Sequence, residues 1–153
     1  MKKVIFVLTV AAVVSACNGS ASENNSISAD TNLTDSIKNE IVQDTANFTT
    51  IKWIDSTYVD AGNVKKGQTV EIPFELENSG EHPLVISSVQ PGCGCTVAEK
   101  PEKPIMTGKK DKIVAKFNST GQSTGAHTKT ITVVANTKPN TQSTLVFKVN
   151  VTE

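Results

Sequence analysis

The chain has 153 residues, enough for one domain of ordinary size with additional length outside it. All 15 basic residues are lysine, and 15 acidic residues balance them, so the formal net charge is zero. Arginine is the side chain that grips phosphates and base edges in a bidentate way, so a neutral, arginine-free chain with 5% aromatic residues argues against sequence-specific nucleic-acid binding.

The first 17 residues have the layout of a bacterial lipoprotein signal peptide. Two lysines precede an apolar run of 11 residues from Val4 to Val14, shorter than the ~20 residues that a membrane-spanning helix needs. The run ends in Val-Ser-Ala-Cys, which resembles the lipobox, where the cysteine is lipidated and becomes the first residue of the mature protein. A simple secretory signal cut near Ala16 is the alternative. We predict a lipoprotein signal peptide over residues 1–16 and acylation of Cys17, with palmitate among the acyl chains.

Lipidation of this kind determines where the domain works. Two or three acyl chains, at about 0.8 kcal/mol per buried methylene, attach a protein to a membrane permanently. Processing also removes two lysines and leaves 13 against 15 acids, and a charge of −2 gives no attraction to an anionic lipid surface. Asn18 follows the cysteine, and by resemblance to the sorting rules of Gram-negative bacteria this residue favours the outer membrane. Because the next residues lack a dense acidic run, we expect an outer-membrane lipoprotein that faces the periplasm.

Residues 17–48 have the composition of a solvated linker, rich in Ser, Asn, Thr, Ala and Asp. Leu33, Ile37 and Ile41 recur every four residues, a spacing compatible with a short amphipathic helix inside this tether. Thirty flexible residues reach about 30 Å on root-mean-square average. We therefore predict a lipidated N-terminus and a flexible linker that holds the following domain away from the membrane without orienting it.

From residue 49 onward, short β-prone runs alternate with turn residues. Apolar and acidic side chains alternate over Val70–Glu77, and Leu145–Val151 repeats the alternation. Strict alternation is what an antiparallel sheet with one solvated face requires. We predict an all-β fold over residues 49–153, an immunoglobulin-like antiparallel β-sandwich of about seven strands. The expected strands are Ile51–Ile54, Tyr58–Val64, Thr69–Asn78, Leu84–Val89, Lys112–Phe117, Lys129–Asn136 and Thr144–Val151.

The same region resembles a known bacterial family. The run Phe74–Gly80 is similar to the strand, Asn and turn signature of the domain of unknown function 1573, and Cys93–Thr96 is similar to its hallmark Cys-Gly-Cys-Thr segment. The resemblance extends over about residues 50–151, although Ala61 stands in place of the usual Phe and Thr107 in place of a Pro. It implies an immunoglobulin-like sandwich, commonly on a lipoprotein, related to sperm-protein and cilium-associated domains that bind other proteins. It implies no established enzymatic activity.

Cys93 and Cys95 lie too close in sequence to form the inter-sheet bridge of an antibody domain. In an extended chain their Cα atoms would lie about 6.5 Å apart, near the upper end of disulfide geometry, and Gly94 would let the backbone contract. The oxidising cell envelope favours such a bond, and a ring this small would be readily reduced. The pair is therefore a candidate for a disulfide or for thiol–disulfide exchange.

Two further interpretations of the cysteine pair stay open. Two thiolates can hold a soft ion such as Cu(I), with Met106 or His82 as a distant third ligand, although the spacing lacks the paired clusters typical of zinc sites. Alternatively the segment is a structural turn in which Cys93 and Cys95 are bridged locally or simply packed.

The chain shows no signature of an enzyme. It has no phosphate loop, nucleophile elbow or paired-carboxylate pattern, and the sequence gives neither histidine a partner acid or serine for catalysis. We predict a non-catalytic envelope module without a cofactor, which binds an unknown protein or glycan through its loops or a sheet edge and reaches the membrane through its N-terminal lipid. The alternative function is a periplasmic thiol-redox or copper-handling protein that uses Cys93 and Cys95.

Overall fold

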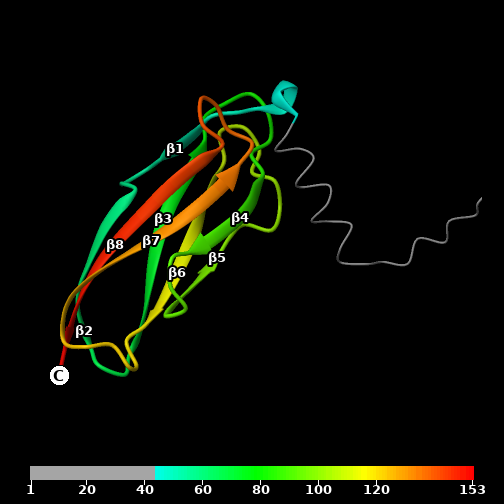
Figure 1. The fold of residues 1–153 in the computed structure, drawn as a ribbon. Helices are drawn as coiled ribbons and strands as arrows, with labels where there is room; N and C mark the ends of the chain where they lie inside the picture. The colour runs from blue at the N-terminus through cyan, green and yellow to red at the C-terminus, as the bar shows by residue number, and fades with distance from the viewer. Residues whose placement is uncertain (1–43) are drawn as a thin grey trace, which may run out of the picture.

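The computed structural model describes residues 44–153, and the predictions for the signal peptide, Cys17 and most of the linker lie outside the described residues. Eight strands form two four-stranded sheets that pack face to face (Figure 1). One sheet has the order β1-β3-β6-β5 and the other the order β2-β8-β7-β4. A short 3-10 helix, η1 (Thr45–Asn47), precedes them. The strands are β1 (Ile51–Trp53), β2 (Tyr58–Lys65), β3 (Thr69–Asn78), β4 (Ile86–Pro91), β5 (Thr96–Glu99), β6 (Lys110–Asn118), β7 (Gly125–Ala135) and β8 (Gln142–Thr152).

The structure confirms the immunoglobulin-like β-sandwich and adds one strand to the seven that were predicted. The additional strand is β5, which has only four residues and begins directly after the Cys-Gly-Cys segment. Thr96 and Ala98 are its less exposed residues and Val97 is exposed, so the run lacks the apolar–polar alternation by which strands are recognised in a sequence. None of the helices in residues 44–153 is long and apolar enough to span a membrane.

One strand pair differs in direction from the prediction. The sequence predicted antiparallel pairing, but β2 and β8 run parallel, with Tyr58 opposite Val146 and Val64 opposite Val151. The other paired strands are antiparallel, so the sheet that contains β2 is mixed. Side chains alternate in the same way in parallel and antiparallel strands, and for this reason the local pattern could not distinguish the two arrangements.

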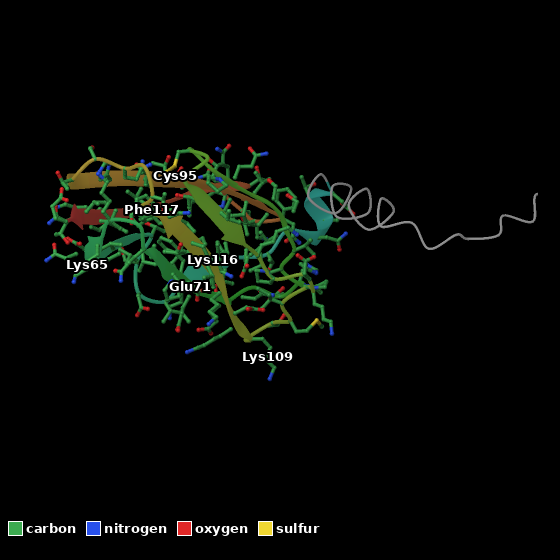
Figure 2. The ribbon with its side chains drawn as sticks, turned by 90° about the horizontal axis from the view of Figure 1, so that it is seen from below. Lys65, Glu71, Cys95, Lys109, Lys116 and Phe117 are labelled. Atoms are coloured by element: carbon green, nitrogen blue, oxygen red, sulfur yellow. A yellow bond between two sulfur atoms is a disulfide. The ribbon has the colours of Figure 1, made fainter. Side chains whose placement is uncertain are left out.

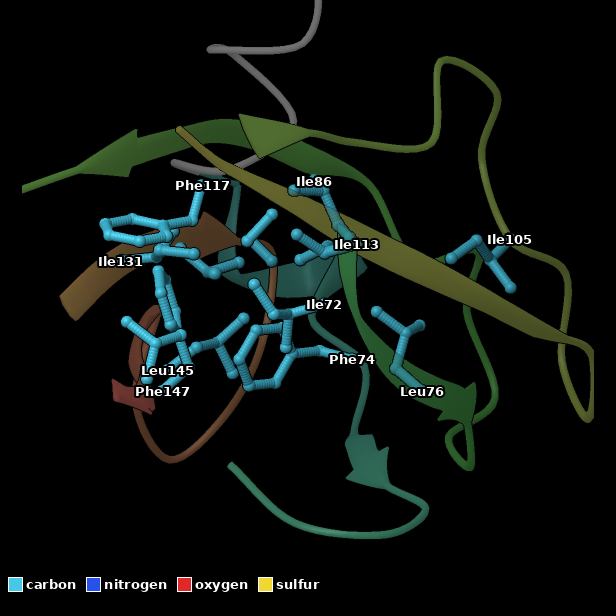
Figure 3. Packing of buried hydrophobic residues seen from close by; sticks show 14 of the residues in the cluster. Ile72, Phe74, Leu76, Ile86, Ile105, Ile113, Phe117, Ile131, Leu145 and Phe147 are labelled. Atoms are coloured by element: carbon cyan, nitrogen blue, oxygen red, sulfur yellow. The ribbon is translucent and has the colours of Figure 1, made fainter. Parts of the chain in front are cut away.

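The core lies between the sheets and consists of the inward-facing residues of the alternating runs (Figure 3). In β3 the buried apolar side chains are Ile72, Phe74 and Leu76, as the alternation predicted, and β8 buries every second residue in the same way. The rings of Phe117 and Phe147 meet edge to face across the core, with centroids 5.9 Å apart. This contact joins β6 of one sheet to β8 of the other. Aromatic side chains bury large apolar areas, so the contact stabilises the packing of the two sheets.

The edge strands are connected in pairs across the sandwich. β4 and β5 are edge strands of different sheets, they contact each other, and residues 92–95 join them (Figure 1). β1 and β2 occupy the opposite edges and are joined by residues 54–57. The Cys-Gly-Cys segment therefore lies in a crossover from one sheet to the other, at one long side of the domain.

Candidate interaction site at the β4–β5 side

The Cys-Gly-Cys segment forms a compact turn in this crossover. Cys93 and Cys95 are joined by a disulfide, and their Cα atoms lie 5.4 Å apart. This separation is shorter than the 6.5 Å or so of an extended chain and falls within ordinary disulfide geometry. Gly94 is exposed, its φ lies outside the left-handed region, and a Cβ placed there would meet no atom within 4 Å. The turn therefore does not need the conformational freedom of glycine, contrary to the expectation from the sequence.

Backbone hydrogen bonds hold both ends of the turn. The Gly92 N–H donates to the Thr130 carbonyl on β7 at 2.9 Å. At the other end, the Cys95 carbonyl accepts from the last residue of β6 at 2.9 Å, and the Thr96 N–H donates back to the Cys93 carbonyl at 3.3 Å. The turn is thus tied to one strand of each sheet by bonds that do not involve sulfur.

The side chain of Thr96 lies beside the disulfide. Its Oγ1 is 3.6 Å from Cys93 Sγ and 3.9 Å from Cys95 Sγ, and the residue is only 6% exposed. Cys95 packs against the core near Phe117, which lies opposite Thr96 on β6 (Figure 2). A hydroxyl in this position can donate a hydrogen bond to either sulfur once the disulfide is reduced.

β5 presents an open edge next to this turn. Within the described residues β5 pairs with a strand on one side only, and its Val97 side chain is 61% exposed. On the outer face of the same sheet, Lys116 Nζ lies 2.7 Å from Glu99 Oε1. It also lies 3.5 Å from Glu71 Oε1 (Figure 2). The hydrogen bond from Lys116 to Glu99 is the main cause that raises the pKa of Lys116 above its ordinary value. The edge therefore combines unpaired backbone, an exposed apolar side chain and an ionic cluster.

The structure does not bring together the soft-metal ligands considered from the sequence. Met106 lies near the start of β4, because its neighbour Ile105 pairs with Leu84 just before that strand. Cys93 comes after the end of β4. His82 also precedes β4, on the side away from the cysteines. Within residues 44–153, no group of three or more His, Cys, Asp or Glu side chains is arranged to hold a metal ion. The geometry thus does not assemble the proposed copper site.

An apolar depression of about 350 Å³ lies at the end of the sandwich next to η1. One of its residues, Asn136, is fully buried and donates from Nδ2 to the carbonyls of Asn47 at 2.8 Å and Pro83 at 2.9 Å. Sequence reasoning missed this role, although an asparagine directly after an alternating run is a signal that could have indicated it. The depression is lined by Asn47, Pro83, Val85, Pro104, Met106 and Asn136.

The N-terminal sequence identifies a membrane-anchored lipoprotein of the bacterial cell envelope. Residues 1–18, which include Cys17, match the prokaryotic membrane lipoprotein lipid attachment site. Residues 51–151 match the family described as "Protein of unknown function (DUF1573)". The chain belongs to this family, and the match confirms the resemblance that the sequence motifs indicated.

Solved structures share the fold at low sequence identity. A protein of unknown function from Porphyromonas gingivalis W83 has a TM-score of 0.61 and 19% identity, and the match covers 69% of this chain but 48% of that one. The chain thus spans about half the length of that protein. The VesB protease of Vibrio cholerae has a TM-score of 0.51 and 9% identity, over 73% of this chain and 34% of the protease chain. No curated protein sequence matches the chain.

Proposed function

We propose that the chain is a non-catalytic, lipid-anchored envelope module that binds a partner protein along the open edge of β5. The observation that carries this proposal is the 61% exposure of Val97 on an edge strand. An extended peptide that pairs with such an edge gains backbone hydrogen bonds, and apolar side chains beside the edge add specificity. The ionic cluster of Lys116, Glu99 and Glu71 on the same sheet favours peptides with complementary charges.

The proposal includes the location of the module. Asn18 after the acylated Cys17 supports retention at the outer membrane, and the linker supports a domain that faces the periplasm. Labelling of cells with radioactive palmitate tests the anchor, and we expect the label on the wild type and its loss in Cys17→Ala. An unlabelled wild type would contradict the anchor. Separation of inner and outer membranes tests the location, and recovery of the wild type in the inner membrane would contradict it.

Site-specific photo-crosslinking in cells tests the binding edge. A photoreactive residue at Val97 is compared with one at Thr128, which is exposed on β7 of the other sheet. We expect a protein adduct from position 97 and none from position 128. Binding of the identified partner in purified form should then be lost in Val97→Glu and retained in Cys93→Ser/Cys95→Ser. Equal adducts at both positions would contradict recognition of a protein at β5. A domain that retains a glycan while position 97 gives no protein adduct would contradict it as well.

A further inference from the structure

The disulfide between Cys93 and Cys95 contributes little to holding the turn that contains it. The turn is already tied to β7 through Gly92 and to β6 through the Cys95 carbonyl. The bond closes the chain over a single residue, Gly94. A ring this small removes little conformational freedom from the unfolded chain, because disulfide stabilisation of that kind grows with the length of the closed loop. A structural role therefore does not account for two cysteines at this place.

The surroundings of the pair suit chemistry at sulfur. Both cysteines are half-buried, and the residue between them is exposed, so a thiolate can approach from the solvent. Because Cys95 packs against the core, we assign Cys93 as the sulfur that is attacked. The Thr96 hydroxyl, 3.6 Å from Cys93 Sγ and 3.9 Å from Cys95 Sγ, is positioned to donate a hydrogen bond to the thiolate that leaves in either half of the exchange.

We propose that Cys93 and Cys95 form a thiol–disulfide exchange site that accepts electrons from dithiols of other envelope proteins. A partner thiolate attacks Cys93 Sγ, a mixed disulfide forms, and Cys95 leaves as a thiolate that takes up a proton. The second thiolate of the partner then attacks the partner's own sulfur in the mixed disulfide. The partner disulfide forms, and Cys93 leaves as a thiolate that is protonated. Two electrons and two protons pass from the partner dithiol to the pair.

The anchors of the turn give the exchange site a distinctive property. The hydrogen bonds of Gly92, Cys95 and Thr96 use backbone atoms and are available in both redox states. The pair can therefore be reduced and reoxidised while the sandwich stays folded. A structural disulfide in a secreted protein, in contrast, resists reduction by glutathione.

Equilibration with glutathione buffers tests this property. We use the full-length chain carrying Cys17→Ala, so that alkylation and mass spectrometry report on Cys93 and Cys95 alone, while the fluorescence of Trp53, the single tryptophan, reports on the fold. We expect half-reduction within the range of the glutathione buffers and an unchanged fluorescence, equal to that of a Cys93→Ser/Cys95→Ser control. A pair that stays oxidised at every glutathione ratio, or that is reduced only as the fluorescence changes, would overturn the proposal.

The rate of reduction by dithiothreitol tests the positioning role of Thr96. We expect Thr96→Val to lower the rate roughly two- to tenfold, the equivalent of one hydrogen bond, and to raise the pH at which the released thiols react with an alkylating agent. The control Thr128→Val changes an exposed threonine on the other sheet and should react as the wild type does. Rates and pH profiles that are the same in both variants would overturn the role of Thr96.

Discussion

The hydroxyl of Thr49 donates a 2.9 Å hydrogen bond to the carboxamide oxygen of Asn78, and both residues are almost completely buried. The Nδ2 of Asn78 also donates to the carbonyls of His82 and Ile105, each at 2.8 Å. One side chain thus connects the start of the domain, the turn after β3 and the loop before β6. Buried polar networks of this kind are stabilising only when every member has its partner.

Replacement of Asn78 by alanine tests this network. Asn78→Ala removes hydrogen bonds to two carbonyls, one hydroxyl and the Gly80 N–H, and we expect the free energy of unfolding to fall by about 2–4 kcal/mol. Urea denaturation followed by Trp53 fluorescence measures the change. Asn150→Ala is the matched control, because its one described side-chain bond joins it to Asn63 at an exposed position, and it should cost less than about 1 kcal/mol. Equal losses for the two variants would contradict the network.

Two glycines test the packing of two separate turns, one before β4 and one after it. A Cβ on Gly80 would collide with the Thr49 hydroxyl and the Thr50 backbone nitrogen, so Gly80→Ala should lower the free energy of unfolding by about 1–3 kcal/mol or more. Gly94→Ala has open space around it and should change that energy by no more than about 0.5 kcal/mol. Thermal and urea denaturation of both variants checks the difference. A Gly94→Ala variant as unstable as Gly80→Ala would contradict the open space around Gly94 in the Cys-Gly-Cys turn.

The edge-to-face contact between Phe117 and Phe147 joins the two sheets. Phe147→Ala removes a fully buried ring and should lower the free energy of unfolding by about 3–5 kcal/mol, through lost transfer energy and the cavity that remains. Tyr58→Ala removes an aromatic ring that is 50% exposed and should cost less than about 1 kcal/mol. Urea denaturation measures both, and a small loss for Phe147→Ala would contradict the assigned core.

The ionic cluster of Lys116, Glu99 and Glu71 predicts a pH dependence of stability at alkaline pH. The pKa of Lys116 is raised above its ordinary value of 10.5, chiefly by its hydrogen bond to Glu99, with Glu71 as a smaller cause. A raised pKa in the folded state gives stability that is fully present below pH 10.5 and is lost as the pH rises through the raised value. NMR titration of the Lys116 side chain should show its pKa fall in Glu99→Gln and fall less in Glu71→Gln. A larger fall in Glu71→Gln would contradict this assignment.

The sequence indicated much of the fold because a period of two assigns each side chain to one face of a sheet. Ile72, Phe74 and Leu76 are buried for this reason, and the strands β3 and β8 were predicted from their alternation. The family motifs at Phe74–Gly80 and Cys93–Thr96 likewise depend only on the order of residues, and the family match confirmed them.

Other features depended on contacts between segments far apart in the chain. The four residues of β5 form a strand because they pair with β6, and no local pattern in the sequence predicts this pairing. The buried role of Asn136 arises because Asn47 and Pro83, 89 and 53 residues away, present carbonyls to it. Met106 is separated from the cysteines because β4 lies between their positions along the domain.

By itself, then, the sequence determined the class of fold, the faces of the long strands and the match to a lipid attachment site, since each depends on local order or spacing. The tertiary structure alone decided the parallel pairing of β2 with β8 and the crossover that places Cys93 and Cys95 between two edge strands beside Thr96. Strand pairing joins residues that are distant in sequence, so neither the direction of a pair nor the neighbours of a turn can be inferred from alternation alone.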